Sequence, residues 1–340
     1  MEEQYGSVVV SSRVRLARNL QDIPFPHKLH DVRAATITHK VYAAVNGTQS
    51  NEQGGAFTLH RMASLSEIDG NVLKEKHLIS ADLLESPYGA AVIDESETCS
   101  IMVNEEDHIR AQCILPGFRL QEAYDAVSRL DDVIAKRVQY AYDKRLGYLT
   151  ACPTNVGTGM RASAMMFLPG LSITRNLESC VRAVARLNMA IRGVYGEGSE
   201  ADGYLYQISN QKTLGVSEQD ILSSVQASIG HIADAELQAR KVLLEADEGA
   251  LRDKIQRAYG ILCNAYKLGT QEFMSLLAMV KLGVYYGIFK VTDVARLEKL
   301  VTEGQPANIL NLSGKDLDAA ERDIYRASYI AKTLKTICKR

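Results

Sequence analysis

The spacing of apolar residues changes once along this chain of 340 residues, and that change restricts the fold more than any other feature. From Tyr5 to about Ile208, apolar and polar residues mostly alternate, as they do in half-buried β-strands. After about Ser217 the apolar residues recur at steps of three and four, which is helical spacing. We therefore expect an α+β protein with two parts, residues 1–215 with strands and flanking helices and residues 216–340 all helical.

The same spacing predicts individual elements. Strands are expected at 7–17, 56–62, 90–94, 99–113, 147–152, 161–167 and 204–209, and helices at about 30–46, 120–144 and 175–192. The segment 46–55, NGTQSNEQGG, has no apolar residue and predicts an exposed loop. In the second part, apolar residues from Leu317 to Cys338 form an unbroken helical stripe. Such a stripe needs a partner, which is either the rest of its own domain or a second copy of the chain in a dimer.

Composition gives no sign of a membrane or secreted protein. No run approaches the roughly 18 apolar residues of a membrane-spanning helix and no signal-peptide pattern is present, so we expect a cytoplasmic protein. The formal net charge of -2 gives no reason to expect a nucleic-acid partner. The cysteines are scattered without a CxxC pair, which argues against a zinc site and a disulfide framework and predicts reduced thiols. They are Cys99, Cys113, Cys152, Cys180, Cys263 and Cys338.

Arginines recur at regular places on the expected strands. Arg13 and Arg15 share one face of the first strand, because alternate side chains of a strand point the same way. Further arginines lie in later segments, namely Arg110, Arg161 and Arg192. Taken alone, each is explained as well by a solvated surface. If the strands are neighbours, however, the guanidinium groups converge and repel one another unless a polyanion lies between them, and a nucleotide triphosphate fits that need.

Carboxylates accompany the arginines in the segment from Asn104 to Arg110. Strand alternation there would place Glu106 on the face of Arg110 and would turn Glu105 and Asp107 to the other face. The segment CPTNVGTGMR, residues 152–161, is either a tight turn or a loop whose glycines let the backbone approach a ligand. It matches neither the GxxxxGK[ST] phosphate loop nor the GxGxxG dinucleotide pattern.

Six segments in chain order carry a resemblance to a known family. They are SSRVRLARN (11–19), SPYGA (86–90), NEEDHIR (104–110), CPTNVGTGMRAS (152–163), IRGVYGEGSEADG (191–203) and ISNQKTLGVSE (208–218). Together they resemble the ATP:guanido phosphotransferase family, which includes arginine and creatine kinases, and most closely its bacterial protein-arginine kinases. The resemblance implies an antiparallel-sheet catalytic domain of the phosphagen-kinase kind over 1–215, with ATP as co-substrate and Mg²⁺ bound to it rather than to a metal site of the protein.

The resemblance also assigns roles to residues. The arginines expected to grip the ATP phosphates are Arg13, Arg15, Arg110, Arg161 and Arg192. His77, in EKHL, resembles a nucleotide-contacting histidine, although a surface histidine is the simpler interpretation. Glu106, rigid on its strand, is expected to be the catalytic base, and Glu197, in a glycine-flanked loop, to hold the second edge of the acceptor guanidinium. Cys152 is expected beside that guanidinium in a tuning role.

The acceptor is expected to be arginine in proteins. Family members that act on free guanidines resemble one another in a preceding helical domain of about a hundred residues, and here the first motif begins at Ser11. By the same resemblance, the helical part 216–340 mediates dimerisation and docks phosphoarginine at Arg322, Asp323 and Arg326 in RDIYRA. Both arginines are expected to lie off the apolar stripe. A solvated helix face with an internal ion pair is the simpler interpretation of that segment.

Implied partners are an activator protein, a Clp-type ATPase that receives the marked proteins, and a stress-gene repressor among the substrates. Two alternatives stay open on the sequence alone. One is a kinase for free arginine or another small guanidine. The other is a non-catalytic adaptor that binds phosphoarginine, against which the full set of arginines and carboxylates argues.

Overall fold

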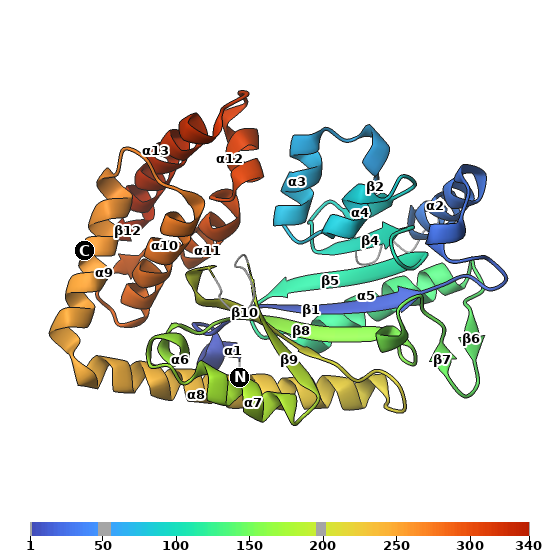
Figure 1. Cartoon of the computed structure of the whole chain (residues 1–340), viewed down its shortest axis with the longest axis horizontal. Coiled ribbons are helices and arrows are strands. Elements are labelled where there is room, and N and C mark those ends of the chain that lie inside the picture. Colours follow the sequence, from blue (N-terminus) through green and yellow to red (C-terminus); the bar gives the residue numbers. More distant parts are fainter. Residues whose placement is uncertain (1, 47–55, 195–201, 340) are drawn as a thin grey trace.

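An antiparallel sheet forms the centre of the first part of the chain (Figure 1). The structure, a computed structural model, describes residues 2–46, 56–194 and 202–339, and within them this sheet has eight strands in the order β2-β3-β4-β5-β1-β8-β10-β9. Every neighbouring pair is antiparallel, so the predicted α+β fold is confirmed. The strands are β1 (Val9–Arg18), β2 (Phe57–Arg61), β3 (Ala90–Asp94), β4 (Cys99–Val103), β5 (Ile109–Pro116), β8 (Met160–Phe167), β9 (Met189–Gly193) and β10 (Leu205–Asn210).

One face of the sheet is the main apolar core. Val14 and Leu16 of β1 are fully buried there beneath three helices. Because burying this face fixes the register of the strands, Arg13 and Arg15 must point to the opposite face. The covering helices are α2 (Asp31–Asn46), α5 (Leu120–Ala135) and the first half of α8 (Glu218–Ala246).

The opposite face is covered towards its two ends. Ile93 of β3 and Met102 of β4 pack beneath two short helices, whereas Phe167 of β8 and Leu205 of β10 pack against the C-terminal helices. The middle of this face, between the two covered ends, is left for a site. The short helices are α3 (Glu67–Glu75) and α4 (Ala81–Glu85).

The C-terminal part is helical, as expected. A capping box of Ser217 and Asp220 starts α8, which is 29 residues long and runs along the base of the molecule in Figure 1. Its first half packs in the core of the sheet, whereas Leu243 and Leu244 pack against the C-terminal helices. The domain boundary expected near residue 215 stays a prediction. None of the described helices is long and apolar enough to cross a bilayer. The later helices are α9 (Glu248–Asn264), α10 (Thr270–Tyr285), α11 (Val294–Glu303), α12 (Pro306–Ser313) and α13 (Ala319–Ile337), with a small sheet of β11 (Lys290–Val291) and β12 (Cys338–Lys339).

The apolar stripe of α13 is buried inside the chain itself. Ala327, Ile330 and Leu334 belong to the C-terminal core, in which α9 packs beside α13. A second copy of the chain is therefore not required to cover them, and a dimer stays a proposal. The stripe also differs from the expected one, because Arg326 lies on the buried side and is 0% exposed. The expectation that both arginines of RDIYRA lie off the buried side was wrong for Arg326.

The strand expected over 99–113 is two strands. β4 and β5 form a hairpin joined by a turn at 104–108, in which Asn104 has a φ of 60°. Asparagine tolerates this left-handed conformation, and the polar run that follows has no apolar side chain to keep on the sheet. Strand alternation from Asn104 to Arg110 was therefore wrong, and Glu106 lies on the turn.

The helix expected over 175–192 is also wrong in its second half. Helices α6 (Pro169–Ile173) and α7 (Leu177–Ala185) are followed by Asn188, with a φ of 56°, and then by strand β9, which pairs with β10. Arg192 is thus on the last strand in the sheet order. Similarly, α5 stops at Ala135 instead of about 144, and the run 147–152 contributes two residues to a small hairpin. That hairpin is β6 (Tyr142–Asp143) with β7 (Gly147–Tyr148).

Cys99 and Cys113 form a disulfide bond, so the expectation of reduced thiols was wrong for this pair. The two residues stand directly opposite each other on β4 and β5, with their Cα atoms 4.2 Å apart. The hairpin brings the two side chains together, because directly opposite residues are the closest cross-strand neighbours. The free cysteines are Cys152, Cys180, Cys263 and Cys338.

Candidate active site

Five arginines line one cavity of about 370 Å³ over the open middle of the sheet. They come from four strands, and Arg15 of β1 stands directly opposite Arg161 of β8. Arg192 of β9 stands opposite Gln207 of β10, which lines the same cavity. The sheet thus brings the five arginines into one cavity, and their role in binding phosphates stays a prediction. The five are Arg13, Arg15, Arg110, Arg161 and Arg192.

The crowding of positive charge shows in the pKa values. Burial, and after it the charges of Arg110 and Arg161, lowers the pKa of Arg13 to about 10. Burial again comes first for Arg15, and Arg13, Arg110 and Arg161 add to it, so that its pKa lies well below the ordinary value. Since both burial and repulsion disfavour the charged forms, a polyanion between these side chains would relieve the strain.

One arginine of the group is held by a carboxylate. Arg110 Nη1 lies 2.8 Å from Glu105 Oε2, and Glu105 is buried and accepts a hydrogen bond from Ser80 on its other oxygen. This ion pair fixes the guanidinium of Arg110 at the edge of the cavity. Sequence reasoning missed it, because an unbroken strand would have turned Glu105 to the other face.

Glu106 and Cys152 lie in the same cavity as the arginines. Burial, followed by the neighbouring charges of Asp107 and Glu105, raises the pKa of Glu106, while Arg110 and a hydrogen bond with Cys152 oppose the rise. The Cys152 sulfur is 3.0 Å from Thr154 Oγ1. A carboxylate with a raised pKa, beside a thiol and facing cations, is suited to accept a proton from a cationic substrate.

The turn of Glu106 and the loop of Cys152 are tied to each other by Asp107. Its buried carboxylate accepts hydrogen bonds from Asn19 Nδ2 at 2.6 Å and from the backbone N–H of Ala151 at 2.7 Å. The Asp107 side chain thus fixes the turn of Glu106 and the loop of Cys152 relative to the end of β1, the strand that carries Arg13 and Arg15.

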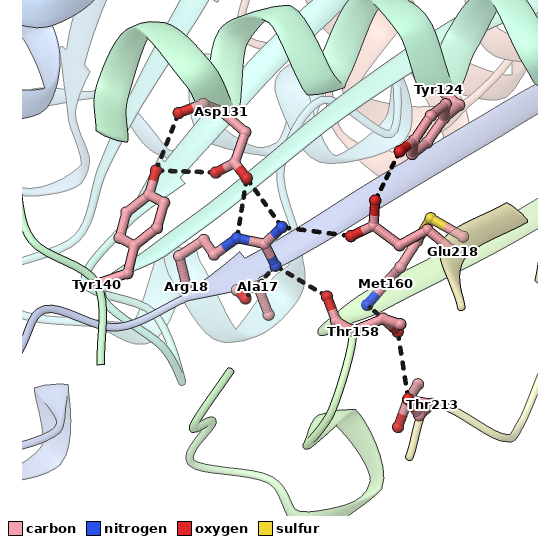
Figure 2. Close-up of polar contacts among 9 residues, drawn as sticks. All are labelled: Ala17, Arg18, Tyr124, Asp131, Tyr140, Thr158, Met160, Thr213 and Glu218. Carbon is pink, nitrogen blue, oxygen red and sulfur yellow. Dashed lines mark hydrogen bonds and ion pairs between the residues drawn. The ribbon is translucent and has the colours of Figure 1, made fainter. Parts of the chain in front are cut away.

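The glycine-containing segment 152–161 is fixed by a buried arginine outside the cavity (Figure 2). Arg18 donates to Asp131 at 2.9 Å and to the carbonyl of Thr158 at 2.9 Å, and its guanidinium lies 3.6 Å from the centroid of the Tyr148 ring. Gly159 has a φ of 61°, and a Cβ on it would meet the carbonyl oxygen of Ala17 at 2.5 Å. This glycine therefore permits a close approach of the segment to β1, and it also lines the arginine cavity.

Two predicted site residues, Glu197 and His77, are not yet accounted for. Glu197 lies outside the described residues. His77, with a φ of 60°, lines a separate small cavity together with Arg13 and Ser11, and burial followed by the charge of Arg13 lowers its pKa to about 4. The structure therefore places His77 near Arg13, which is expected to bind phosphate, but not among the residues that line the main cavity.

Sequence reasoning also missed polar residues that line the main cavity. Gln207 and Ser209 share a face of β10, and alternation in the run 204–209 indicates that shared face but not that it lines the cavity. Asp82 comes from α4, for which no sequence signal was noted. The loop contributes Thr154 and Asn155.

The C-terminal candidates lie far from this cavity in the chain and have different surroundings. Arg326 is fully buried and donates to the carbonyls of Gly304 and Leu268, each at 2.7 Å, and to Asp323 at 2.6 Å. Arg322 is the more exposed of the two, and its guanidinium lies 3.7 Å from Asp323. Arg326 is thus a structural residue that orients Asp323.

Next to these residues, a carboxylate from α3 occupies the N-terminus of α12. Glu75 accepts hydrogen bonds from the backbone N–H groups of Ala307 and Asn308, both at 2.9 Å, and from Asn308 Nδ2 at 2.8 Å. Burial lowers the pKa of Arg326, and Asp323 and, more weakly, Glu75 oppose that shift. The N-terminus of α12 therefore already holds a negative group, as helix N-termini favour.

The chain is similar to known proteins over almost its whole length. The sequence model of the ATP:guanido phosphotransferase C-terminal catalytic domain matches residues 36–239, and that of the protein-arginine kinase McsB C-terminal domain matches residues 248–340. A protein-arginine kinase of Caldanaerobacter subterraneus subsp. tengcongensis is 44% identical over 328 residues, covering 96% of this chain and 97% of the relative. That of Bacillus subtilis is 43% identical over 333 residues, covering 97% of this chain and 90% of the relative.

Solved structures share the fold. A crystal structure of lombricine kinase has a TM-score of 0.60 and 25% identity, covering 68% of this chain and 67% of that one. The substrate-free duplicated taurocyamine kinase from Schistosoma mansoni has a TM-score of 0.60 and 24% identity, covering 80% of this chain and 40% of that one, and supports the fold alone.

Crowding of the arginines predicts that one substitution raises the stability of the anion-free protein and weakens its stabilisation by a polyanion. Arg15→Gln removes a charge that the folded state disfavours, so we expect the free energy of unfolding of the anion-free protein to rise by ~1 kcal/mol and its melting temperature by about 1–2 °C. The same change removes a phosphate ligand, so stabilisation by added tripolyphosphate should fall by at least about half. Thermal denaturation with and without tripolyphosphate measures both effects. Arg33→Gln, at an exposed position on α2, is the control, and a variant that melts lower yet responds to tripolyphosphate like the unaltered protein contradicts the account.

Proposed function

The chain belongs to the ATP:guanido phosphotransferase family, and we propose that it transfers the γ-phosphoryl group of ATP to the guanidinium group of arginine residues in proteins. The observation that carries the proposal is the cavity in which five arginines face Glu106, a carboxylate with a raised pKa. Arginine side chains form charge-assisted hydrogen bonds with phosphate oxygens, and a carboxylate forms them with a guanidinium group.

The arginines bind and stabilise the phosphates. Phosphoryl transfer asks little covalent work of a protein, so fixed positive charge around the transferring group supplies most of the acceleration. The described residues contain no cluster of three or more His, Cys, Asp or Glu side chains suited to a metal ion. By the family resemblance, Mg²⁺ would be held through ATP oxygens and water, as is usual for this ion, and would neutralise phosphate charge.

Glu106 acts on the acceptor. A guanidinium has a pKa above about 12 and is a poor nucleophile until a positioned base takes a proton from it. In the proposed step, a guanidinium nitrogen forms a bond to the γ-phosphorus, the bond from that phosphorus to the β,γ-bridging oxygen breaks, ADP leaves, and the proton passes to Glu106. By the family resemblance, Glu197 holds the other edge of the guanidinium. Cys152, beside Glu106, tunes its electrostatic surroundings.

Protein arginine as the acceptor is supported by the relatives. Those named protein-arginine kinase match this chain over almost the whole of both sequences, including the helical C-terminal part. The structural relatives with small guanidine substrates in their names match a smaller share of the chain at lower identity.

The test compares acceptors. The protein is incubated with Mg²⁺ and ATP and with either an unfolded arginine-rich protein or free arginine, and acid-labile phosphate is measured on each. We expect phosphate on the protein, a loss of at least about 100-fold with Glu106→Gln because the base is gone, and a smaller loss with Cys152→Ser. Since protonated Glu106 accepts no proton, the rate should also fall on the acidic side at a pH above the ordinary pKa of glutamate.

The control for Glu106→Gln is Glu95→Gln, which changes an exposed carboxylate in the β3–β4 turn, at the opposite end of the β4–β5 hairpin. Phosphate that appears on free arginine alone identifies a small-guanidine kinase. Full activity of Glu106→Gln contradicts the assigned base.

We further propose that Arg322 and Asp323 dock phosphoarginine, with Arg326 as the residue that positions Asp323. Supporting this, the buried Nε of Arg322 has no hydrogen-bond partner among the described residues, and the nearby N-terminus of α12 accepts an anionic group, here Glu75. A phosphoryl group would pair with Arg322, and the guanidinium portion with Asp323.

Phosphoarginine is therefore expected to change the rate of the kinase through this site. In Arg322→Ala the ratio of rates with and without added phosphoarginine should fall to about one, because a charge-assisted phosphate contact is lost. Arg252→Ala, on an exposed ion pair of α9, is the matched control. A response of Arg322→Ala equal to that of the unaltered protein rejects the site.

The remaining parts of the proposal rest on the family resemblance. They are a homodimer, an activator protein, a Clp-type ATPase that receives the marked proteins, and a stress-gene repressor among the substrates. A cytoplasmic location is proposed with them, because ATP is the co-substrate.

A further inference from the structure

A second cavity, of about 550 Å³, adjoins the arginine cavity. The two cavities share Asp82 and Glu106 in their walls. Glu106 therefore faces the place of the phosphates on one side and this second cavity on the other. A substrate whose guanidinium reaches Glu106 has the rest of its chain close to the second cavity.

Carboxylates predominate among the titratable groups of this cavity wall, and His27 is the one basic side chain among the described residues that line it. Among the described residues that line it there are four carboxylates and no lysine or arginine. Glu105 is paired with Arg110, and Glu106 is assigned to the acceptor. Asp82 and Glu85 remain, three residues apart on α4, both exposed and without an ion-pair partner in the described parts of the chain.

A buried amide in the same wall lacks a hydrogen-bond donor. Asn104 is 2% exposed, and its Nδ2 donates to the carbonyl of Ala34 at 3.0 Å and to Thr38 Oγ1 at 3.3 Å, which fixes the orientation of the amide. Its Oδ1 has no partner among the described residues. Buried acceptors without a donor are rare in native proteins, so this atom calls for a donor from the cavity beside it, either a water or a ligand.

The other walls suit the aliphatic part of a long side chain. Tyr88, 39% exposed, and Pro26 line the cavity together with Leu29. Lysine and arginine pack their methylene groups on such surfaces while their charged ends reach carboxylates.

From these observations we propose that the second cavity binds the polypeptide next to the target arginine and selects a lysine or arginine side chain there. The inference rests on the proposed function, because it takes Glu106 to hold the target guanidinium. Asp82 and Glu85 attract the flanking cation. Asn104 accepts a hydrogen bond from the same segment.

The test uses three peptides that differ in the residues flanking one target arginine, which are lysine, alanine or glutamate. We expect kcat/KM for the lysine peptide to exceed that for the glutamate peptide by about tenfold at low ionic strength, since two exposed carboxylates attract one and repel the other. The difference should shrink as salt is added. In Glu85→Gln the ratio should fall to about threefold, and in Glu85→Lys, where the new cation offsets Asp82, to about one, whereas Glu95→Gln keeps the original ratio.

The possible results distinguish failure of this inference from failure of the proposed function. Equal rates on the three peptides overturn the inference and leave the proposed function standing. A lysine preference that both Glu85 variants leave unchanged overturns the assignment to this cavity. Phosphorylation of free arginine with none of any peptide rejects the proposed function, and the inference with it.

Discussion

Repulsion among five guanidinium groups on one face of a single sheet is the constraint around which this molecule is arranged. The opposite face supplies the stabilisation that holds the strands in register, because Val14, Leu16 and their neighbours are buried beneath α2, α5 and α8. At the two ends of the arginine face, α3 with α4 and the C-terminal helices provide further apolar contact. The positive charges are thus confined to the middle, where a polyanion can bind between them.

A second set of contacts places the acceptor groups against this charge. Asp107 connects the turn of Glu106 to the loop of Cys152 and to the end of β1. Arg18 connects the same loop to α5 through Asp131, and Glu218 at the start of α8 lies 3.6 Å from Arg18 (Figure 2). These residues touch no substrate in the proposed mechanism. They fix the turn of Glu106 and the loop of Cys152 relative to the sheet that carries the arginines, and so set the distance between the phosphates and the carboxylate.

Alternation along a strand was enough to predict that Arg13 and Arg15 share the face opposite the core, because their neighbours Val14 and Leu16 are strongly apolar. It failed from Asn104 onwards, where polar residues follow one another and no apolar side chain fixes a face. The helical period of the C-terminal part was equally readable, but the burial of Arg326 was not, since it depends on carbonyl groups of distant segments. The Cys99–Cys113 bond and the contribution of Gln207 depend on which strands pair, and strand order is not contained in local spacing.

The central claim is that the arginine cavity holds the phosphates of ATP with the acceptor guanidinium against Glu106. The most direct measurement is a crystal structure of the protein with Mg²⁺, ADP, nitrate as a planar stand-in for the transferring phosphoryl group, and an arginine-containing peptide. The account predicts the ADP phosphates and the nitrate in contact with the five arginines of the cavity, and the peptide guanidinium between the nitrate and Glu106. A nucleotide bound outside this cavity, or a guanidinium bound away from Glu106, would contradict it.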